Sequence, residues 1–160
     1  TYSGIGPDCR VLVDKARKVC QTYKKMYLEP IPIGQLVREI ASVFQEFTQS
    51  GGVRSFGVSL LVAGADVSGQ HLFQVDPSGT FYPWKAAAIG KNFVSARAFL
   101  EKRYTNDIEA EDAMSTALLA LKDSFDGRMT TENASAARVL DGKFVILTDA
   151  ELADYISQLP

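Results

Sequence analysis

Residues 57–79, GVSLLVAGADVSGQHLFQVDPSG, decide the fold of this chain. Residues 57–63 are a short apolar run with the length of a buried strand. A polar turn at residues 66–69 leads into a second strand over residues 71–75. Asp76-Pro77-Ser78-Gly79 is typical of a tight turn, because Asp and Pro suit its first positions and Gly supplies a positive φ. The stretch therefore predicts consecutive antiparallel strands.

The flanking sequence predicts one more strand directly after this stretch. It also predicts two helices before the stretch and two after it. The strand covers residues 80–88, and Pro83 places it at a sheet edge or a bulge. Asp8 is expected to cap the first helix and Asn106 or Asp107 the fourth. Apolar residues recur at helical spacing in three stretches, at residues 8–27, 33–47 and 107–125, and a further helix is expected at about residues 91–103.

The carboxyl-terminal part predicts a hairpin and a last helix. Strands at residues 134–140 and 143–147 are joined by Asp141-Gly142, a strong hairpin signal. Thr148-Asp149-Ala150-Glu151 is a capping box that opens a helix to Gln158. Antiparallel hairpins and paired helices indicate an α+β fold rather than a parallel βαβ sheet.

The composition excludes several classes of protein. The 160 residues contain 17 Lys and Arg against 19 Asp and Glu, giving a net charge of −2, and 46% are hydrophobic. This balance argues against a disordered chain and against a strongly basic nucleic-acid binder. The longest apolar stretch, residues 60–65, is far shorter than the roughly 20 residues of a membrane span. We therefore expect neither nucleic acid nor a membrane as a partner.

The residue types that carry most enzyme chemistry are scarce. Cys9 and Cys20 fall in one helical pattern about 16 Å apart along its axis, too far for a disulfide, so we expect reduced thiols. His71 alone cannot build a multi-histidine zinc site, and its neighbours lack a G-x-S-x-G nucleophile elbow. Thr1 could in principle act as an amino-terminal nucleophile, but it leads directly into a helix start. We expect no catalytic residue, no metal and no cofactor.

Two weaker patterns leave alternatives open. Gly90-Lys91 at a helix start is compatible with anion binding, although further donors are missing. The overall acidity favours a solvated helix face over a nucleic-acid stripe for the basic residues of the first helix, which are Arg10, Lys15, Arg17, Lys18, Lys24 and Lys25.

Longer strings resemble a known family. They include YSGIGPD at residues 2–8, EPIP at 29–32, QEFTQSGGVR at 45–54 and FLEKRY at 99–104. With them the chain resembles the alpha subunits of the 20S proteasome up to about Thr130, and the string at 49–54 is typical of the type-2 class. Ser55 departs from the proline usual there. The residues that carry the family signature, in a structural role, are Gly57, Asp76, Pro77, Ser78, Gly79, Trp84, Lys85, Gly90 and Lys91.

This resemblance implies a fold and a function. The fold is the four-layer αββα sandwich of amino-terminal-nucleophile hydrolases, here one domain over residues 1–160 that lacks the family's opening helix and first strands. The function is that of a non-catalytic subunit in ubiquitin-dependent protein degradation. Its partners would be other alpha subunits in a seven-membered ring, the beta-ring subunits and regulatory particles, in cytoplasm and nucleus. A catalytic threonine-protease subunit of the same fold and an unrelated small binding module are the alternatives.

Overall fold

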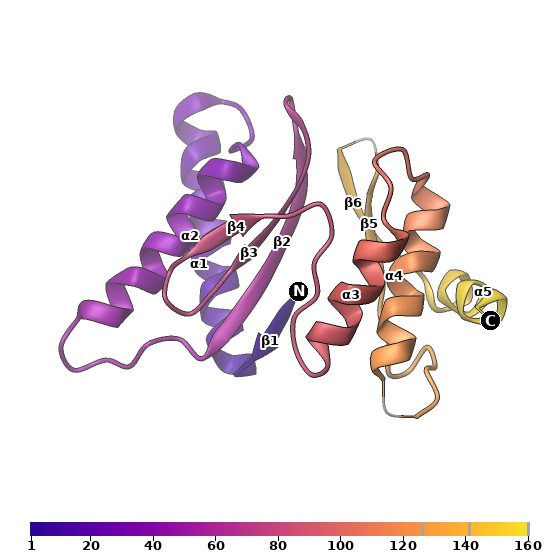
Figure 1. Ribbon diagram of the computed structural model, residues 1–160. Helices are drawn as coiled ribbons and strands as arrows, with labels where there is room; N and C mark the ends of the chain where they lie inside the picture. Colours follow the sequence, from indigo (N-terminus) through magenta and orange to yellow (C-terminus); the bar gives the residue numbers. More distant parts are fainter. Residues whose placement is uncertain (126, 141, 160) are drawn as a thin grey trace. The chain divides into compact units, whose positions relative to one another are not determined.

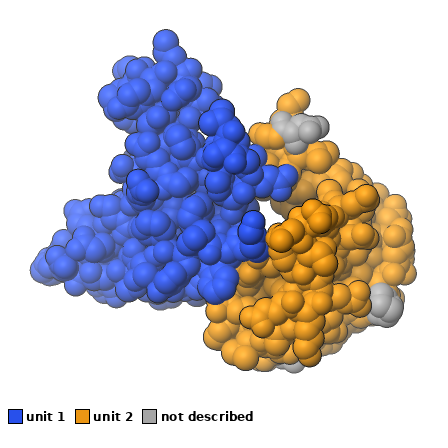
Figure 2. Space-filling model, turned by 45° about the horizontal axis from the view of Figure 1, so that its top comes forward, with its two compact units in different colours: residues 1–85 blue, residues 86–160 orange. Residues whose placement is uncertain are grey.

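A computed structural model describes residues 1–125, 127–140 and 142–159. These residues form two compact units, Thr1–Lys85 and Ala86–Pro160, which are coloured separately in Figure 2. Each unit has its own buried apolar cluster. The prediction that residues 1–160 form one domain stays a prediction.

The first unit is a four-stranded antiparallel sheet with two helices (Figure 1). Its strands β1 (Tyr2–Gly4), β2 (Val58–Asp66), β3 (Gly69–Val75) and β4 (Phe81–Pro83) lie in that order, so the hairpin of β2 and β3 is at the centre. At the start of the chain, β1 pairs with β2 through Tyr2 and Leu60. In chain order the elements are β1 (Tyr2–Gly4), α1 (Gly6–Tyr27), α2 (Ile33–Gln49), β2 (Val58–Asp66), β3 (Gly69–Val75) and β4 (Phe81–Pro83).

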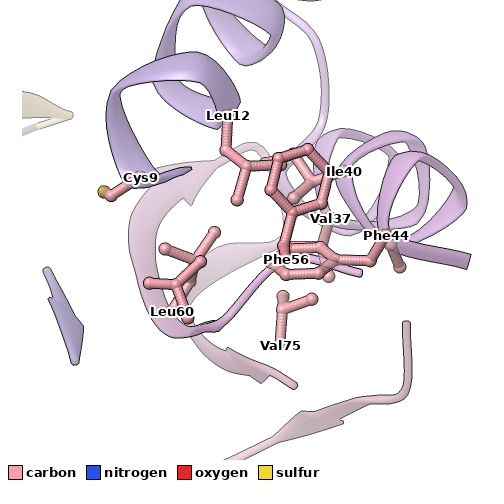
Figure 3. Packing of buried hydrophobic residues seen from close by; sticks show 10 residues of the cluster. Cys9, Leu12, Val37, Ile40, Phe44, Phe56, Leu60 and Val75 are labelled. Atoms are coloured by element: carbon pink, nitrogen blue, oxygen red, sulfur yellow. The ribbon is translucent and has the colours of Figure 1, made fainter. Parts of the chain in front are cut away.

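Both helices of this unit pack on the same face of the sheet. Val37 and Phe44 of α2 are fully buried, and Val75 of β3 is also fully buried in the same cluster. The ring of Phe56 meets that of Phe44 edge to face, with centroids 5.4 Å apart. Figure 3 shows these side chains together with Leu12 of α1. Since apolar burial is the main favourable term in folding, this cluster holds the unit together.

The second unit packs three helices with a two-stranded hairpin. Its cluster joins Leu118 of α4 to Leu152 of α5, together with Met129 and Ala134 from the connecting segment. Its elements are α3 (Phe93–Arg103), α4 (Ala110–Ser124), β5 (Ala137–Leu140), β6 (Lys143–Ile146) and α5 (Asp149–Gln158).

The local turn and cap signals are confirmed here. The Thr148 hydroxyl accepts from the Glu151 amide at 3.3 Å, and the Glu151 carboxylate accepts from the Thr148 amide at 2.8 Å. Leu140 and Lys143 pair as the hairpin signal predicts, although Asp141 itself lies outside the described residues.

The sequence predicted the end of one strand and the caps of two helices wrongly. The strand predicted over residues 80–88 ends at Pro83, and the Trp84 amide makes one further bond to the Leu72 carbonyl at 2.8 Å. Neither Asn106 nor Asp107 caps α4, because that helix starts later, with Glu109 at the cap position. Asp8 does not cap α1 either, since Ile5 occupies the cap position and the Asp8 carboxylate is bound elsewhere.

The fourth predicted helix is also shorter than expected at its carboxyl end. Phe125, the last residue of the apolar pattern at 107–125, follows α4 in extended conformation, and Leu121 in the same pattern is 42% exposed. Within the described residues, no helix is both long and apolar enough to cross a membrane.

Candidate functional site

The turn Asp76–Gly79 has the predicted geometry and lies against α2. The Gly79 amide donates to the Asp76 carbonyl at 2.9 Å, and the Asp76 amide donates to the Thr80 carbonyl at the same distance. Gly79 has φ of 81°, and a Cβ there would lie 2.8 Å from the carbonyl oxygen of Ala41. Glycine is therefore required both for the backbone conformation and for the close approach to α2.

Gly57 lies at a second junction, where the segment before β2 meets the start of α1. Its amide donates to Oδ2 of Asp8 at 2.9 Å. The Arg54 guanidinium donates to both oxygens of the same carboxylate, each at 2.7 Å. A Cβ at Gly57 would lie 2.6 Å from Cδ1 of Ile5. Asp8 thus fixes the segment that connects α2 to β2, which sequence reasoning missed because the partners are 46 positions apart.

The bonds to Asp8 lower the pKa of its carboxyl group. The Arg54 guanidinium and then the Gly57 amide lower the pKa of the Asp8 carboxyl to about 2. Charge-assisted bidentate bonds of this kind favour the ionised form. The folded-state pKa is below the ordinary value, so the stabilisation is present at neutral pH and is lost as the pH falls through the folded pKa.

We therefore predict an acid-dependent contribution from this pair. An Arg54→Met variant should be less stable than the wild type at neutral pH, and the gap should narrow as the pH falls from about 4 to about 2. Urea unfolding midpoints of both proteins across that range measure it. A gap that stays constant over the range would contradict the assignment.

The remaining signature residues are Trp84 and Lys85, at the end of the first unit, and Gly90 and Lys91, in the second unit. The Trp84 amide donates to the Leu72 carbonyl at 2.8 Å, the residue is 40% exposed, and the adjacent Lys85 is also exposed. Gly90 has φ of 102° and precedes exposed Lys91 in the second unit. The structural role predicted for the nine signature residues stays a prediction, as does anion binding at Gly90-Lys91.

His71 belongs to a polar group that sequence reasoning did not find. The group, called here the Asp66 cluster, consists of Asp66, Ser68 and His71 at the β2–β3 turn. The Asp66 Oδ1 atom accepts from the Ser68 amide at 2.8 Å and from its hydroxyl at 2.5 Å. His71 Nε2 lies 3.1 Å from the same oxygen and 2.9 Å from Ser68 Oγ. An Asp two residues before a Ser in a turn was the available signal, since Asx turns bind their own backbone.

This cluster contains Ser, His and Asp without the arrangement of a catalytic triad. A triad needs the serine on one imidazole nitrogen and the carboxylate on the other. Here both contact Nε2, and the Ser68 hydroxyl donates to Asp66. Bonds from the Ser68 hydroxyl and amide hold the pKa of Asp66 well below its usual range. The cluster therefore stabilises a turn and does not activate a nucleophile.

Thr1 extends the first ladder of the sheet. Its nitrogen donates to the Leu61 carbonyl at 2.9 Å, and its carbonyl accepts from the Leu61 amide at 2.9 Å. The nitrogen is thereby placed as a continuation of β1 alongside β2. Over the residues that the structure describes, no group of three or more His, Cys, Asp or Glu side chains could hold a metal ion.

Glu111 shows what the acidic start of α4 does. Its carboxylate accepts a hydrogen bond from the Tyr155 hydroxyl, and Arg138 Nη1 lies 3.5 Å from its other oxygen. It thus connects α4 to β5 and to α5. The bond to Glu111 is the main cause of the raised pKa of Tyr155. This role is structural, in addition to the favourable helix-dipole position that the sequence predicts.

Comparisons with known proteins give a consistent result. Residues 1–139 match the family model described as "Proteasome subunit". The "Proteasome subunit alpha type-2" of Trypanosoma brucei brucei is 65% identical over 159 residues, which cover 99% of this chain and 69% of that protein. The proteins of the same description from Dictyostelium discoideum and, as type-2-A, from Arabidopsis thaliana are 57% and 56% identical, each covered over 68% of its length.

Proposed function

The chain belongs to the proteasome subunit family, and on that premise we propose that it occupies one position in a seven-membered alpha ring stacked on a beta ring. The resemblance to type-2 alpha subunits is confirmed by relatives that match 99% of the chain. The chain is a non-catalytic subunit of the alpha ring of the 20S proteasome. The predicted fold class is likewise confirmed, since this family has the amino-terminal-nucleophile hydrolase fold and the chain is α+β.

One observation carries the proposal: the identity of 65% to an alpha type-2 subunit extends across nearly the whole chain. Local geometry supports a structural role, because the carboxylates of Asp8 and Asp66 are both engaged in bonds between segments of the fold. The unrelated small binding module considered from the sequence is contradicted by the family match over residues 1–139.

The finer parts of the function follow from the same premise. The ring would gate the entry of substrates and dock regulatory particles, within a threonine endopeptidase complex that degrades ubiquitin-marked proteins. Heterologous contacts between different subunits are the kind that close into rings. We place the protein in cytoplasm and nucleus, in line with two free cysteines and no disulfide between them.

A peptidase assay separates this proposal from a catalytic subunit of the same fold. The full-length protein carrying Thr1→Ala is incorporated into the barrel in cells, and the purified barrel is assayed with fluorogenic peptides. We expect the wild-type rate, because Thr1 continues a strand beside Leu61. A barrel that carries Ser68→Ala is assayed in the same way, because Ser68 supplies the hydroxyl of the Asp66 cluster, and the wild-type rate is expected for it as well. Loss of turnover with either variant would assign catalysis to this chain and overturn the proposal.

A further inference from the structure

The cap at the start of α2 comes from another part of the chain. The first amides of a helix have no partner inside it, and carboxylates are among their preferred acceptors. Pro32 occupies the cap position of α2, and a proline side chain has no acceptor to offer. Instead, the amide of Ile33, the first residue of the helix, donates to Oδ2 of Asp66 at 3.1 Å. Asp66 lies at the end of β2, so it caps this helix from 33 positions along the chain.

The turn between β2 and β3 holds the Asp66 carboxylate in place. Its Oδ1 atom accepts from the Ser68 amide at 2.8 Å and from the Ser68 hydroxyl at 2.5 Å, which leaves Oδ2 for the helix. Asp66 also pairs with Gly69 at the turn end of the β2–β3 ladder. Beside this polar contact, the Ile33 side chain covers Gly64, where an added Cβ would overlap Ile33 Cδ1. A polar and an apolar contact thus attach the same helical residue to the hairpin.

The surroundings determine how far an opening at this point extends. Further along α2, Val37 is fully buried in the core of the first unit, and it keeps the body of the helix packed. Before the helix, the connector at residues 28–32 begins with Leu28, which is 88% exposed. Between the two, the Leu36 amide closes the first helical turn on the Pro32 carbonyl at 3.0 Å. Loss of the cap would therefore free the connector and the first turn while the core stays closed.

We propose that the Asp66 cluster is a strap, which keeps the first turn of α2 and the connector before it closed against the β2–β3 hairpin. Release of the Asp66 carboxylate opens this segment as a unit, and the sheet remains folded. Ile31, the buried residue of the connector, is then uncovered beside Tyr27 and Leu28, which are exposed in the closed state. The strap thus sets how much apolar surface this end of the first unit presents. The inference concerns conformation within the chain and stands apart from the proposed function.

Native-state amide exchange of the full-length protein at a single pH tests the strap. The reporter is the Leu36 amide, because it keeps its acceptor, the Pro32 carbonyl, when Asp66 is replaced. In the wild type, we expect its exchange to be nearly independent of low urea concentrations, because a local opening exposes little surface. The Val75 amide, at a fully buried residue of β3, should exchange faster as urea is added. In Asp66→Ala, Leu36 exchange should become about three- to thirtyfold faster, the scale of a lost helix cap, and stay independent of urea.

Two further variants complete the test. Asp14→Ala is the matched control, since Asp14 is a carboxylate on α1 whose side chain is 71% exposed, and it should leave Leu36 exchange unchanged. Ser68→Ala removes the hydroxyl that orients Asp66 and keeps the carboxylate, so it should give a smaller acceleration, and it decides the question if Asp66→Ala does not fold. Leu36 exchange that rises with urea as steeply as that of Val75 would overturn the strap. So would exchange that neither Asp66→Ala nor Ser68→Ala accelerates beyond the Asp14→Ala control.

Discussion

Replacing Phe44 by alanine should lower the free energy of unfolding by about 3–5 kcal/mol. The Phe44 side chain is fully buried, and it lies in one cluster with Val37 and Val75. Its ring also makes an edge-to-face contact with Phe56. Alanine would remove the ring and leave a cavity between α2 and the sheet, which the surrounding residues cannot fully close.

The measurement is urea unfolding followed by circular dichroism, with Phe144→Ala as the matched control. Phe144 is the same residue type at a site that is 68% exposed in β6. Its replacement should change stability by less than about 0.5 kcal/mol in the isolated chain. Similar losses for the two variants would mean that the cluster around Phe44 is not the core.

The second large effect is expected at the signature turn. Gly79→Ala should destabilise the chain by about 2–4 kcal/mol, combining left-handed backbone strain with a steric clash. The backbone has φ of 81°, and the added Cβ would lie 2.8 Å from the Ala41 carbonyl oxygen and 3.0 Å from Gln45 Cβ. Neither the backbone of α2 nor the turn can yield without loss of packing.

Gly34→Ala is the control for this substitution. Gly34 lies in α2, and a Cβ there meets nothing within 4 Å. Alanine is the better helix former, so this variant should be more stable by up to about 1 kcal/mol. Unfolding midpoints of the two glycine variants should therefore move in opposite directions. Equal shifts would show that Gly79 is not constrained by α2.

Patterns confined to neighbouring residues predicted the fold well. The strand before the turn Asp76–Gly79, the second helix and the Thr148 capping box were all confirmed, because their signals depend on bonds only a few residues apart. The sequence predicted a strand to residue 88, but pairing with β3 ends at Pro83. Where a strand stops depends on its partner, which a local pattern does not contain.

Contacts between residues far apart in the chain were missed at the candidate site as well, because a local pattern does not contain the partner. Asp8 looks like a helix cap in sequence, yet its carboxylate binds Arg54 and the Gly57 amide, far along the chain. The contact between Asp66 and the Ile33 amide was missed for the same reason. Function, by contrast, was predicted from long strings that resemble a family, because no reactive group in the sequence identified it.

Native mass spectrometry of the complex purified through the full-length protein tests whether this chain assembles into an alpha ring. We expect a barrel of roughly 28 subunits in stacked closed rings, with this chain in its alpha rings. Recovery of the protein as a lone monomer, under conditions that keep other proteasome subunits assembled, would contradict it.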